Sequence, residues 1–190
     1  MRGLVLAGGK SRRFGTDKAL AIYEDRTLLE TAVSLLLSVR LDPVVVTRRG
    51  ADYSFAGCMV LMDALADKGP LGGIYTAMSF FKETQFLILT CDTPALTPAA
   101  LSALLSAHGK ENTATVFRVA DGQIQPFPGI YGPSIFQTVR ERLFQDQLSM
   151  QGLLEVLSNK NAISWQGNPE IFANVNRQED LTVISKERTK

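Results

Sequence analysis

The chain has 190 residues, of which 45% are hydrophobic and 21% charged, and its formal net charge is +1. This is the composition of an ordinary globular protein that is long enough for a full core, so we expect a single domain over residues 1–190. A net charge this small gives no indication of a nucleic-acid partner or a membrane surface, and no apolar run reaches the roughly 18 residues of a spanning helix.

The two cysteines show no disulfide framework, and no signal peptide precedes the first predicted strand, so we expect a cytoplasmic protein. The single histidine, His108, argues against a zinc site and against a histidine-activated nucleophile. His108 is expected to lie at the C-terminus of a helix, where a cation suits the helix dipole.

Strands and helices are predicted to alternate along the first two thirds of the chain. Apolar runs predict buried strands at 2–7, 44–47, 58–62, 86–90 and 113–119, the last returning through a hairpin into 124–131. Helices are predicted to begin at Thr27, which starts a capping box with Glu30, and at Thr97, which precedes a proline. Other expected segments are an extended piece at 20–23, a loop at 66–73 followed by a helix, helices at 134–145 and 150–158, a strand at 162–165 and a short helix after 172–180.

This alternation predicts βαβ units, and therefore an α/β fold with a mainly parallel sheet and helices on both faces. Pro126 and Pro128 interrupt the arm 124–131, so we expect an edge strand or a bulged strand there.

The stretch 6–18, LAGGKSRRFGTDK, is the clearest candidate for chemistry. A strand-like run ends in Gly8 and Gly9, and four cations follow within nine residues. Glycines let backbone N–H groups approach phosphate oxygens, and the cations neutralise charge, so the stretch is typical of a phosphate cradle. A basic surface turn is the alternative. The pattern is not a P-loop, because Leu4 occupies the place of the required first glycine, and it is not the dinucleotide fingerprint, because position 10 is not glycine.

Three further polar stretches follow predicted strands, at 47–49, 62–63 and 91–94. In open α/β sheets, ligands bind outside the carboxyl ends of the strands, so a parallel sheet would bring all four stretches to one edge. A cationic glycine loop would then face the strand-end carboxylates Asp63 and Asp92. Phosphate oxygens together with a carboxylate are the ligands that Mg²⁺ prefers.

The set of motifs resembles the molybdenum cofactor guanylyltransferase family of the NTP-transferase superfamily. The resemblance lies in LAGGKSRRFGTDKAL at 6–20 with its Asp17-Lys18 pair, GPLGG at 69–73, CDTP at 91–94 and FANVN at 172–176. It implies a three-layer Rossmann-like nucleotidyltransferase fold with a small antiparallel element. It also implies a Mg²⁺-dependent transfer of GMP from GTP to a molybdopterin-type cofactor, with other cofactor-biosynthesis or acceptor proteins as partners.

The resemblance also implies roles for individual residues. Arg13, Lys18 and Asp92 would be catalytic: the two cations would hold the phosphates, and Asp92 would bind Mg²⁺. The nucleotide would be held by Leu6, Ala7, Gly8, Gly9, Lys18, Thr47, Asp63, Leu71, Gly72, Gly73 and Asp92, with the guanine approaching the glycine backbone at 72–73. Asn174 and Asn176 would contact the acceptor.

Three positions depart from the family pattern. Thr47 stands where the family usually offers asparagine to the nucleoside, and a hydroxyl replaces only part of the hydrogen bonding of an amide. Gln125 stands where a histidine is frequent, and the region 145–152 lacks an expected arginine. Two alternatives therefore stay open: a cytidylyl- or sugar-phosphate nucleotidyltransferase of the same fold, and a non-catalytic nucleotide-binding relative.

Overall fold

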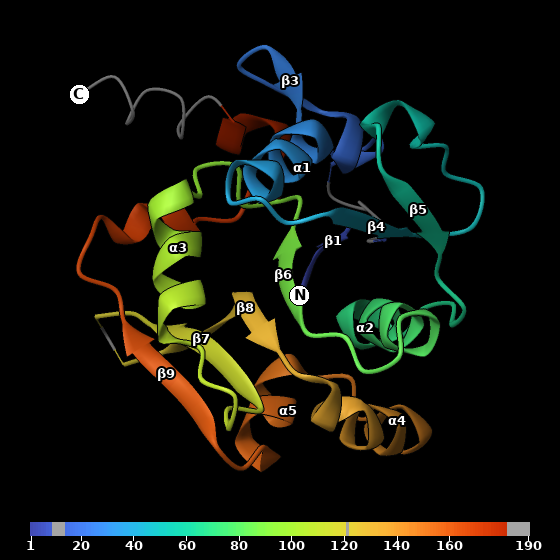
Figure 1. Ribbon diagram of the computed structural model, residues 1–190. Coiled ribbons are helices and arrows are strands. Elements are labelled where there is room, and N and C mark those ends of the chain that lie inside the picture. The colour runs from blue at the N-terminus through green and yellow to red at the C-terminus, as the bar shows by residue number, and fades with distance from the viewer. Residues whose placement is uncertain (9–13, 121, 182–190) are drawn as a thin grey trace.

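The computed structural model describes residues 1–8, 14–120 and 122–181 (Figure 1). Within these ranges the chain forms, in order, β1 Arg2–Leu6, η1 Lys18–Leu20, β2 Ile22–Tyr23, β3 Arg26–Thr27, α1 Leu28–Ser38, β4 Pro43–Thr47, η2 Ser54–Ala56, β5 Met59–Met62, α2 Gly69–Phe80, β6 Phe86–Thr90, α3 Pro98–Ala107, β7 Ala114–Arg118, β8 Ile124–Tyr131, η3 Pro133–Ile135, α4 Phe136–Phe144, α5 Met150–Val156, β9 Lys160–Ser164 and η4 Pro169–Phe172. The η elements are short 3₁₀ helices.

One seven-stranded sheet runs through the molecule in the order β5-β4-β1-β6-β8-β7-β9. β1 pairs in parallel with both β4 and β6, and β4 pairs in parallel with β5. β8 runs antiparallel to its neighbours β6 and β7, and β9 lies parallel to β7. The strands β2 and β3 form a separate antiparallel pair. The expected mainly parallel sheet with a small antiparallel element is therefore confirmed.

Helices cover both faces of this sheet because its central strands are apolar on both sides. Along β1, Leu4 and Leu6 belong to one hydrophobic cluster, and Val5 belongs to another, since successive side chains of a strand point to opposite faces. The first cluster contains side chains of α2, α4 and α5, and the second contains side chains of α1 and α3. Figure 1 shows these two groups of helices on opposite sides of the sheet. The three-layer prediction is confirmed.

Both predicted helix starts are confirmed by their caps. At the start of α1, the Glu30 N–H donates to the Thr27 hydroxyl at 3.1 Å, and the Thr27 N–H donates to the Glu30 carboxylate at 2.8 Å. At the start of α3, the Ala100 N–H donates to the Thr97 hydroxyl at 3.3 Å. These bonds satisfy N–H groups that a helix leaves without an internal partner.

The prediction of a loop throughout 66–73 is wrong, because α2 begins at Gly69. Pro70 is compatible with the first turn of a helix, where a backbone N–H has no internal partner. Gly73 is needed for packing, since a Cβ there would lie 2.7 Å from Leu6 Cδ2. The glycine therefore lets α2 pack closely on β1, and it does not mark the end of regular structure.

The prediction of an edge strand or a bulged strand for the proline-containing segment is confirmed in its second form. β8 is bulged: the register shifts so that Gln125 pairs with Phe117, whereas Gly129 pairs with Val116. It is not an edge strand, because it lies between β6 and β7. The prolines are accommodated because residues 126–128 fall between the two paired stretches, where strand pairing requires no backbone N–H donor.

His108 caps the C-terminus of α3, as expected, but its environment does not favour a cation. Its Nδ1 lies 2.8 Å from the Thr115 hydroxyl oxygen. Burial lowers the pKa of the ring, and nearby Glu111 opposes this effect. The ring is therefore neutral near pH 7, and its role is structural.

The remaining expected elements occur close to their predicted places. The extended piece is β2, the helices are α4 and α5, and the last strand is β9. The short helix expected after 172–180 falls largely on residues 182–190, which lie outside the described residues.

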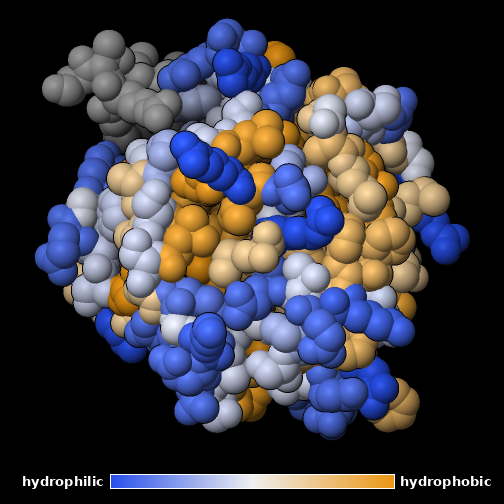
Figure 2. Space-filling view, in the orientation of Figure 1, coloured by the Kyte–Doolittle hydropathy of each residue, from blue (hydrophilic) through white to orange (hydrophobic). Residues whose placement is uncertain are grey.

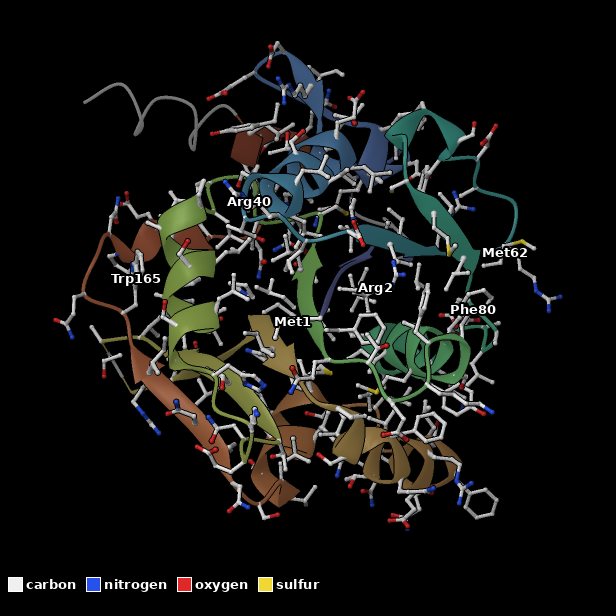
Figure 3. The ribbon with its side chains drawn as sticks, in the orientation of Figure 1. Met1, Arg2, Arg40, Met62, Phe80 and Trp165 are labelled. Atoms are coloured by element: carbon white, nitrogen blue, oxygen red, sulfur yellow. The ribbon has the colours of Figure 1, made fainter. Side chains whose placement is uncertain are left out.

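The face shown in Figure 2 has apolar side chains across its middle and right, with hydrophilic ones gathered above and below them. Met62 and Phe80, on the right in Figure 3, are exposed members of β5 and α2. β5 is an edge strand. Because it has only four residues, it offers few free backbone groups for pairing with another chain. Over residues 1–8, 14–120 and 122–181, every helix is too short or too polar to cross a bilayer.

Candidate functional site

A cavity of about 880 Å³ opens at the carboxyl edge of the parallel part of the sheet. Four strand ends contribute to it, each through the residues that directly follow or close the strand. They supply Leu6, Ala7 and Gly8 after β1, Arg48 and Arg49 after β4, Asp63 after β5, and Thr90, Cys91 and Asp92 at the end of β6. The predicted convergence on one edge is therefore confirmed for the described parts of the four stretches, whereas residues 9–13 of the first stretch lie outside the described residues. The volume suits a small-molecule ligand.

Lys18 and Asp92 meet at one end of this cavity. Lys18 Nζ donates to Asp92 Oδ2 at 3.0 Å, although the two residues are 74 positions apart. Their side chains are 13% and 26% exposed. Lys18 begins η1, and Asp92 lies in the turn after β6. A fixed cation and a fixed carboxylate are thus brought together by tertiary structure alone.

The C-terminal segment is attached to the same place. The Val175 N–H donates to the backbone carbonyl of Asp92 at 2.7 Å, and Asn176 lines the cavity. The Asp180 carboxylate accepts the N–H groups of Asn176 and Arg177 at 2.7 and 2.8 Å, which holds this turn. These bonds, with help from nearby cations, lower the pKa of Asp180.

One oxygen of Asp92 is available for a metal ion. Among the described residues, Asp92 Oδ1 is buried and has no hydrogen-bond partner. A buried carboxylate oxygen without a partner is costly, and a divalent cation would satisfy it. The described residues contain no cluster of three or more metal-ligating side chains. Asp92 therefore fits Mg²⁺ in the usual manner of one carboxylate with phosphate and water oxygens.

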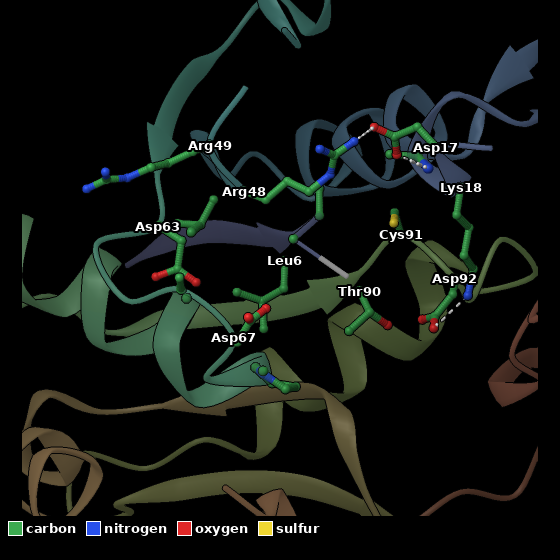
Figure 4. A pocket seen from close by; sticks show the side chains of 18 of the residues that line it. Leu6, Asp17, Lys18, Arg48, Arg49, Asp63, Asp67, Thr90, Cys91 and Asp92 are labelled. Atoms are coloured by element: carbon green, nitrogen blue, oxygen red, sulfur yellow. Dashed lines mark hydrogen bonds and ion pairs between the residues drawn. The ribbon is translucent and has the colours of Figure 1, made fainter. Parts of the chain in front are cut away.

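Asp63 and Asp67 lie at the opposite end of the cavity from the Lys18–Asp92 pair (Figure 4). Asp63 Oδ1 accepts the Leu65 N–H at 3.0 Å and the Thr76 hydroxyl at 2.8 Å, which fixes the carboxylate against α2. Asp67 has a positive φ of 61°, a backbone conformation that is uncommon outside glycine. One end of the cavity therefore holds two carboxylates, whereas the other holds a paired cation and carboxylate.

Gly72 supports the position of Asp63. A Cβ at Gly72 would lie 3.1 Å from Asp63 Oδ2 and 3.2 Å from the Leu65 carbonyl oxygen. Gly72 is buried and does not line the cavity, whereas Gly73 does. A side chain at either position would thus crowd its neighbours, and of the two glycines only Gly73 lines the cavity.

Both carboxylate oxygens of Asp17 accept hydrogen bonds from other protein groups on the cavity wall. Its Oδ1 accepts the Ala19 N–H at 3.2 Å, which caps η1. Its Oδ2 accepts the Tyr53 hydroxyl at 2.8 Å and Arg48 at 3.3 Å. Figure 4 shows Arg48 reaching Asp17 across the top of the cavity. Asp17 therefore ties the loop after β4 to the helix that carries Lys18.

Cys91 adds no nucleophile to this site. Burial, with a further contribution from the negative charge of Asp92, raises the pKa of its thiol to about 12. The thiol is protonated at neutral pH, and the thiolate is the reactive form.

The cavity does not contain all of the residues predicted for it. It is lined by Leu6, Ala7, Gly8, Lys18, Asp63, Gly73, Asp92 and Asn176. Thr47, Leu71 and Gly72 are buried elsewhere, and Asn174 is exposed outside the cavity. Gly9 and Arg13 lie outside the described residues.

Several lining residues had no predicted role, in particular Phe14, Arg48, Arg49 and Asp67. Arg48 and Arg49 belong to the strand-end stretch 47–49, but the family resemblance assigned nucleotide binding to Thr47 alone in that stretch. The Thr47 side chain is fully buried, so the two arginines present this strand end to a ligand. Phe14 lies within the candidate stretch 6–18 but carries neither a charge nor a hydrogen-bonding group, and Asp67 does not directly follow a predicted strand, so neither residue had a predicted role.

The charges around the cavity indicate what it can bind. Its described lining holds four carboxylates and three cations, namely Asp17, Asp63, Asp67 and Asp92 with Lys18, Arg48 and Arg49. This balance does not favour a polyanion by itself. A triphosphate would bind together with a divalent cation, which reverses the local charge near Asp92.

Comparisons with known proteins give a consistent result. Residues 3–163 match the family model of the MobA-like NTP transferase domain. The chain is 31% identical over 182 residues to a probable molybdenum cofactor guanylyltransferase of Flavobacterium johnsoniae, and the match covers 95% of this chain and 94% of that protein.

Two solved structures show the breadth of this fold. Molybdopterin-guanine dinucleotide biosynthesis protein A of Archaeoglobus fulgidus superposes with a TM-score of 0.79 at 20% identity, covering 100% of this chain and 99% of that one. The 2-C-methyl-D-erythritol 4-phosphate cytidylyltransferase of Thermus thermophilus superposes with a TM-score of 0.72 at 14% identity, covering 98% of each chain. At such identities, the likeness concerns the fold alone.

Proposed function

The chain belongs to the MobA-like NTP transferase domain family and is a nucleotidyltransferase, and on that premise we propose that it transfers GMP from GTP to a molybdopterin-type molybdenum cofactor. The observation that carries this proposal is the Lys18–Asp92 pair, which joins η1 to the turn after β6 at 3.0 Å inside the cavity. The named guanylyltransferase relative, matched over nearly its full length, supports the choice of nucleotide and acceptor.

The proposed reaction is a direct displacement at phosphorus. A terminal phosphate oxygen of the cofactor attacks the α-phosphorus of GTP, a new P–O bond forms, and the bond to the leaving pyrophosphate breaks. Such transfers depend on positioning and charge neutralisation, and they need no covalent enzyme intermediate. A cavity with fixed charges and a protonated Cys91 suits this chemistry.

Each end of the cavity has a distinct part in this proposal. Lys18 binds the phosphates and stabilises the charge that develops on the pyrophosphate as it leaves. Asp92 would hold Mg²⁺ through its free Oδ1. When bound, Mg²⁺ supplies charge neutralisation and polarises the phosphoryl oxygens. At the other end, the fixed carboxylate of Asp63 contacts the nucleoside, and Gly73 leaves room beside it.

A substrate panel tests the proposal. The protein is incubated with Mg²⁺, a molybdopterin-type cofactor, and GTP, CTP, ATP or UTP in separate reactions, and pyrophosphate release is followed. We expect release with GTP that depends on the cofactor. Turnover with CTP and none with GTP would contradict the proposal and favour the cytidylyl alternative.

The variant Asp92→Ala tests the non-catalytic alternative. Loss of the carboxylate removes the proposed ligand of Mg²⁺ and the partner that orients Lys18, so transfer is expected to fall by about 100-fold or more. A matched control is Asp42→Ala, which removes the 3.9 Å ion pair with Arg2 outside the cavity and leaves transfer unchanged. Transfer by Asp92→Ala at the wild-type rate would exclude Asp92 from the metal site. Cytoplasmic localisation and protein partners stay predictions.

A further inference from the structure

Tyr53 stands apart from the rest of its loop because it is only 1% exposed, although both neighbours in the sequence are exposed. Its ring belongs to the hydrophobic cluster on the α1 and α3 face, together with Ala19 of η1. Core packing therefore fixes where the Tyr53 hydroxyl lies. Tyr53 does not line the cavity itself, so it has no direct contact with a ligand there.

The hydroxyl of Tyr53 acts as a donor to Asp17. Burial raises the pKa of Tyr53 strongly, and the hydrogen bond to Asp17 raises it further. The hydroxyl is thus protonated at every ordinary pH, and it donates to Asp17 Oδ2 at 2.8 Å. The other partner of this oxygen, Arg48, is half exposed and lies at 3.3 Å. A short bond from a buried donor to a carboxylate outweighs a half-exposed ion pair.

Asp17 in turn controls the element that carries Lys18. Its second oxygen caps η1, a single turn of three residues that begins at Lys18. Such a short element has little stability of its own, so its orientation depends on its cap. A released Asp17 carboxylate would also compete with Asp92 for the ammonium group of Lys18, because Lys18 is its neighbour in the chain.

We propose that Tyr53 is a positioning residue, which holds the Asp17 carboxylate so that η1 presents Lys18 to Asp92 and to the phosphates. The role of Lys18 in this inference rests on the proposed function. The Tyr53–Asp17 bond and its effect on the Lys18–Asp92 contact are independent of that function. The effect is expected mainly in the chemical step, because Lys18 stabilises charge that grows as pyrophosphate leaves.

The variant Tyr53→Phe removes the hydroxyl and keeps the buried ring. We expect kcat for GTP transfer to fall about tenfold, since small misplacements of a charged group are costly, while KM for GTP changes less than about threefold. In the double variant Tyr53→Phe with Asp17→Asn, kcat should be no lower than in Asp17→Asn alone, because both changes break one chain of contacts. Two results would overturn the inference. One is a loss of kcat in the double variant equal to the product of the two single losses, and the other is a Tyr53→Phe kcat within twofold of wild type.

Tyr131→Phe is the matched control. The Tyr131 hydroxyl is also buried and donates at 2.8 Å to the Pro126 carbonyl, but Tyr131 does not line the cavity. Both variants lose one buried hydrogen bond, so the melting temperature of each should fall. Only Tyr53→Phe should lower kcat. An equal loss of kcat in both variants would show a general effect of stability and overturn the positioning role.

Crystal structures of the wild type and of Tyr53→Phe test the inference without turnover. The wild type should retain the Lys18–Asp92 contact of 3.0 Å. The variant should show Asp17 rotated away from its present partners and the Lys18–Asp92 distance beyond hydrogen-bonding range, roughly 3.5 Å. An unchanged contact in the variant would contradict the inference. A wild-type protein that turns over no nucleotide would instead contradict the proposed function, and this structural comparison would still decide the role of Tyr53.

Discussion

The Lys18–Asp92 pair is more enclosed than the surface ion pairs Arg2–Asp42 and Lys68–Asp146. Arg2–Asp42 and Lys68–Asp146 include strongly exposed carboxylates, and such pairs contribute little to stability. Lys18 and Asp92 are mostly enclosed, where removing two charges from water offsets much of their attraction. The pair is therefore better explained by binding and catalysis than by its contribution to folding.

His108 leads to a prediction about stability and pH. Its pKa in the folded protein is lowered from about 6.5 by burial. Between the folded and the unfolded pKa, the unfolded chain binds a proton that the folded chain does not, so stability falls as the pH drops below about 6.5. We expect the melting temperature to decrease over this window, measured by thermal unfolding between pH 7.5 and 5.5.

His108→Asn is the control for that measurement, because the chain contains one histidine. Its melting temperature should vary less between pH 7.5 and 5.5 than that of the wild type. Identical pH profiles for the two proteins would assign the loss of stability to carboxylates and contradict the role of His108.

At the scale of elements, glycines decide how closely neighbours pack. Gly73 lets α2 approach β1 at Leu6, and Gly72 leaves space for the Asp63 carboxylate. In β8, Gly129 lies where the strand rejoins the ladder after its bulge. These glycines serve close approach between elements, and each of the three has negative or unremarkable φ, so conformational freedom is not the reason for them.

Gly129→Ala is predicted to destabilise β8. A Cβ there would lie 2.6 Å from the Pro126 carbonyl oxygen, which is backbone and cannot rotate away, and 2.9 Å from the Tyr131 ring. Overpacking of this kind costs about 1–3 kcal/mol in free energy of unfolding, measured by chemical denaturation.

Gly132→Ala is the matched control, three residues along the same chain. The nearest atoms to its added Cβ lie at 3.6 Å or more, which is ordinary contact. Its free energy of unfolding should change by less than about 0.5 kcal/mol. Equal effects of the two substitutions would contradict the packing explanation.

At the scale of the whole molecule, the strand order creates the site. β1 lies between β4 and β6, so segments more than 40 residues apart in the chain end side by side at one edge. The C-terminal segment then attaches to the turn after β6. A ligand that spans the cavity would contact several of these segments at once, and its binding should stabilise the whole fold.

Thermal unfolding with nucleotides tests this expectation. At 100 times its dissociation constant, a ligand that binds only the folded state adds about 2.7 kcal/mol, which raises the melting temperature by about 5–10 °C at this size. We expect such a shift with Mg²⁺ and GTP, a smaller shift with CTP at the same concentration, and a reduction by EDTA. Equal shifts with GTP and CTP would contradict guanine selectivity.

The sequence by itself determined the local parts of this protein. Apolar runs located β1, β4, β6 and β8 within about a residue, and the Thr27 and Thr97 caps located two helix starts. Strands and helix caps depend on residues that are close together in the chain, so the sequence pattern predicts them directly. The strand-end rule also located the edge of the sheet where the cavity opens.

Tertiary structure alone decided which of the candidate residues meet. The sequence shows that Thr47 and Arg48 follow one strand, but only packing buries Thr47 and turns Arg48 toward the cavity. Likewise, the bond from Tyr53 to Asp17 joins residues 36 positions apart. Such contacts depend on how loops pack against the core and against one another, and no local sequence pattern predicts that arrangement.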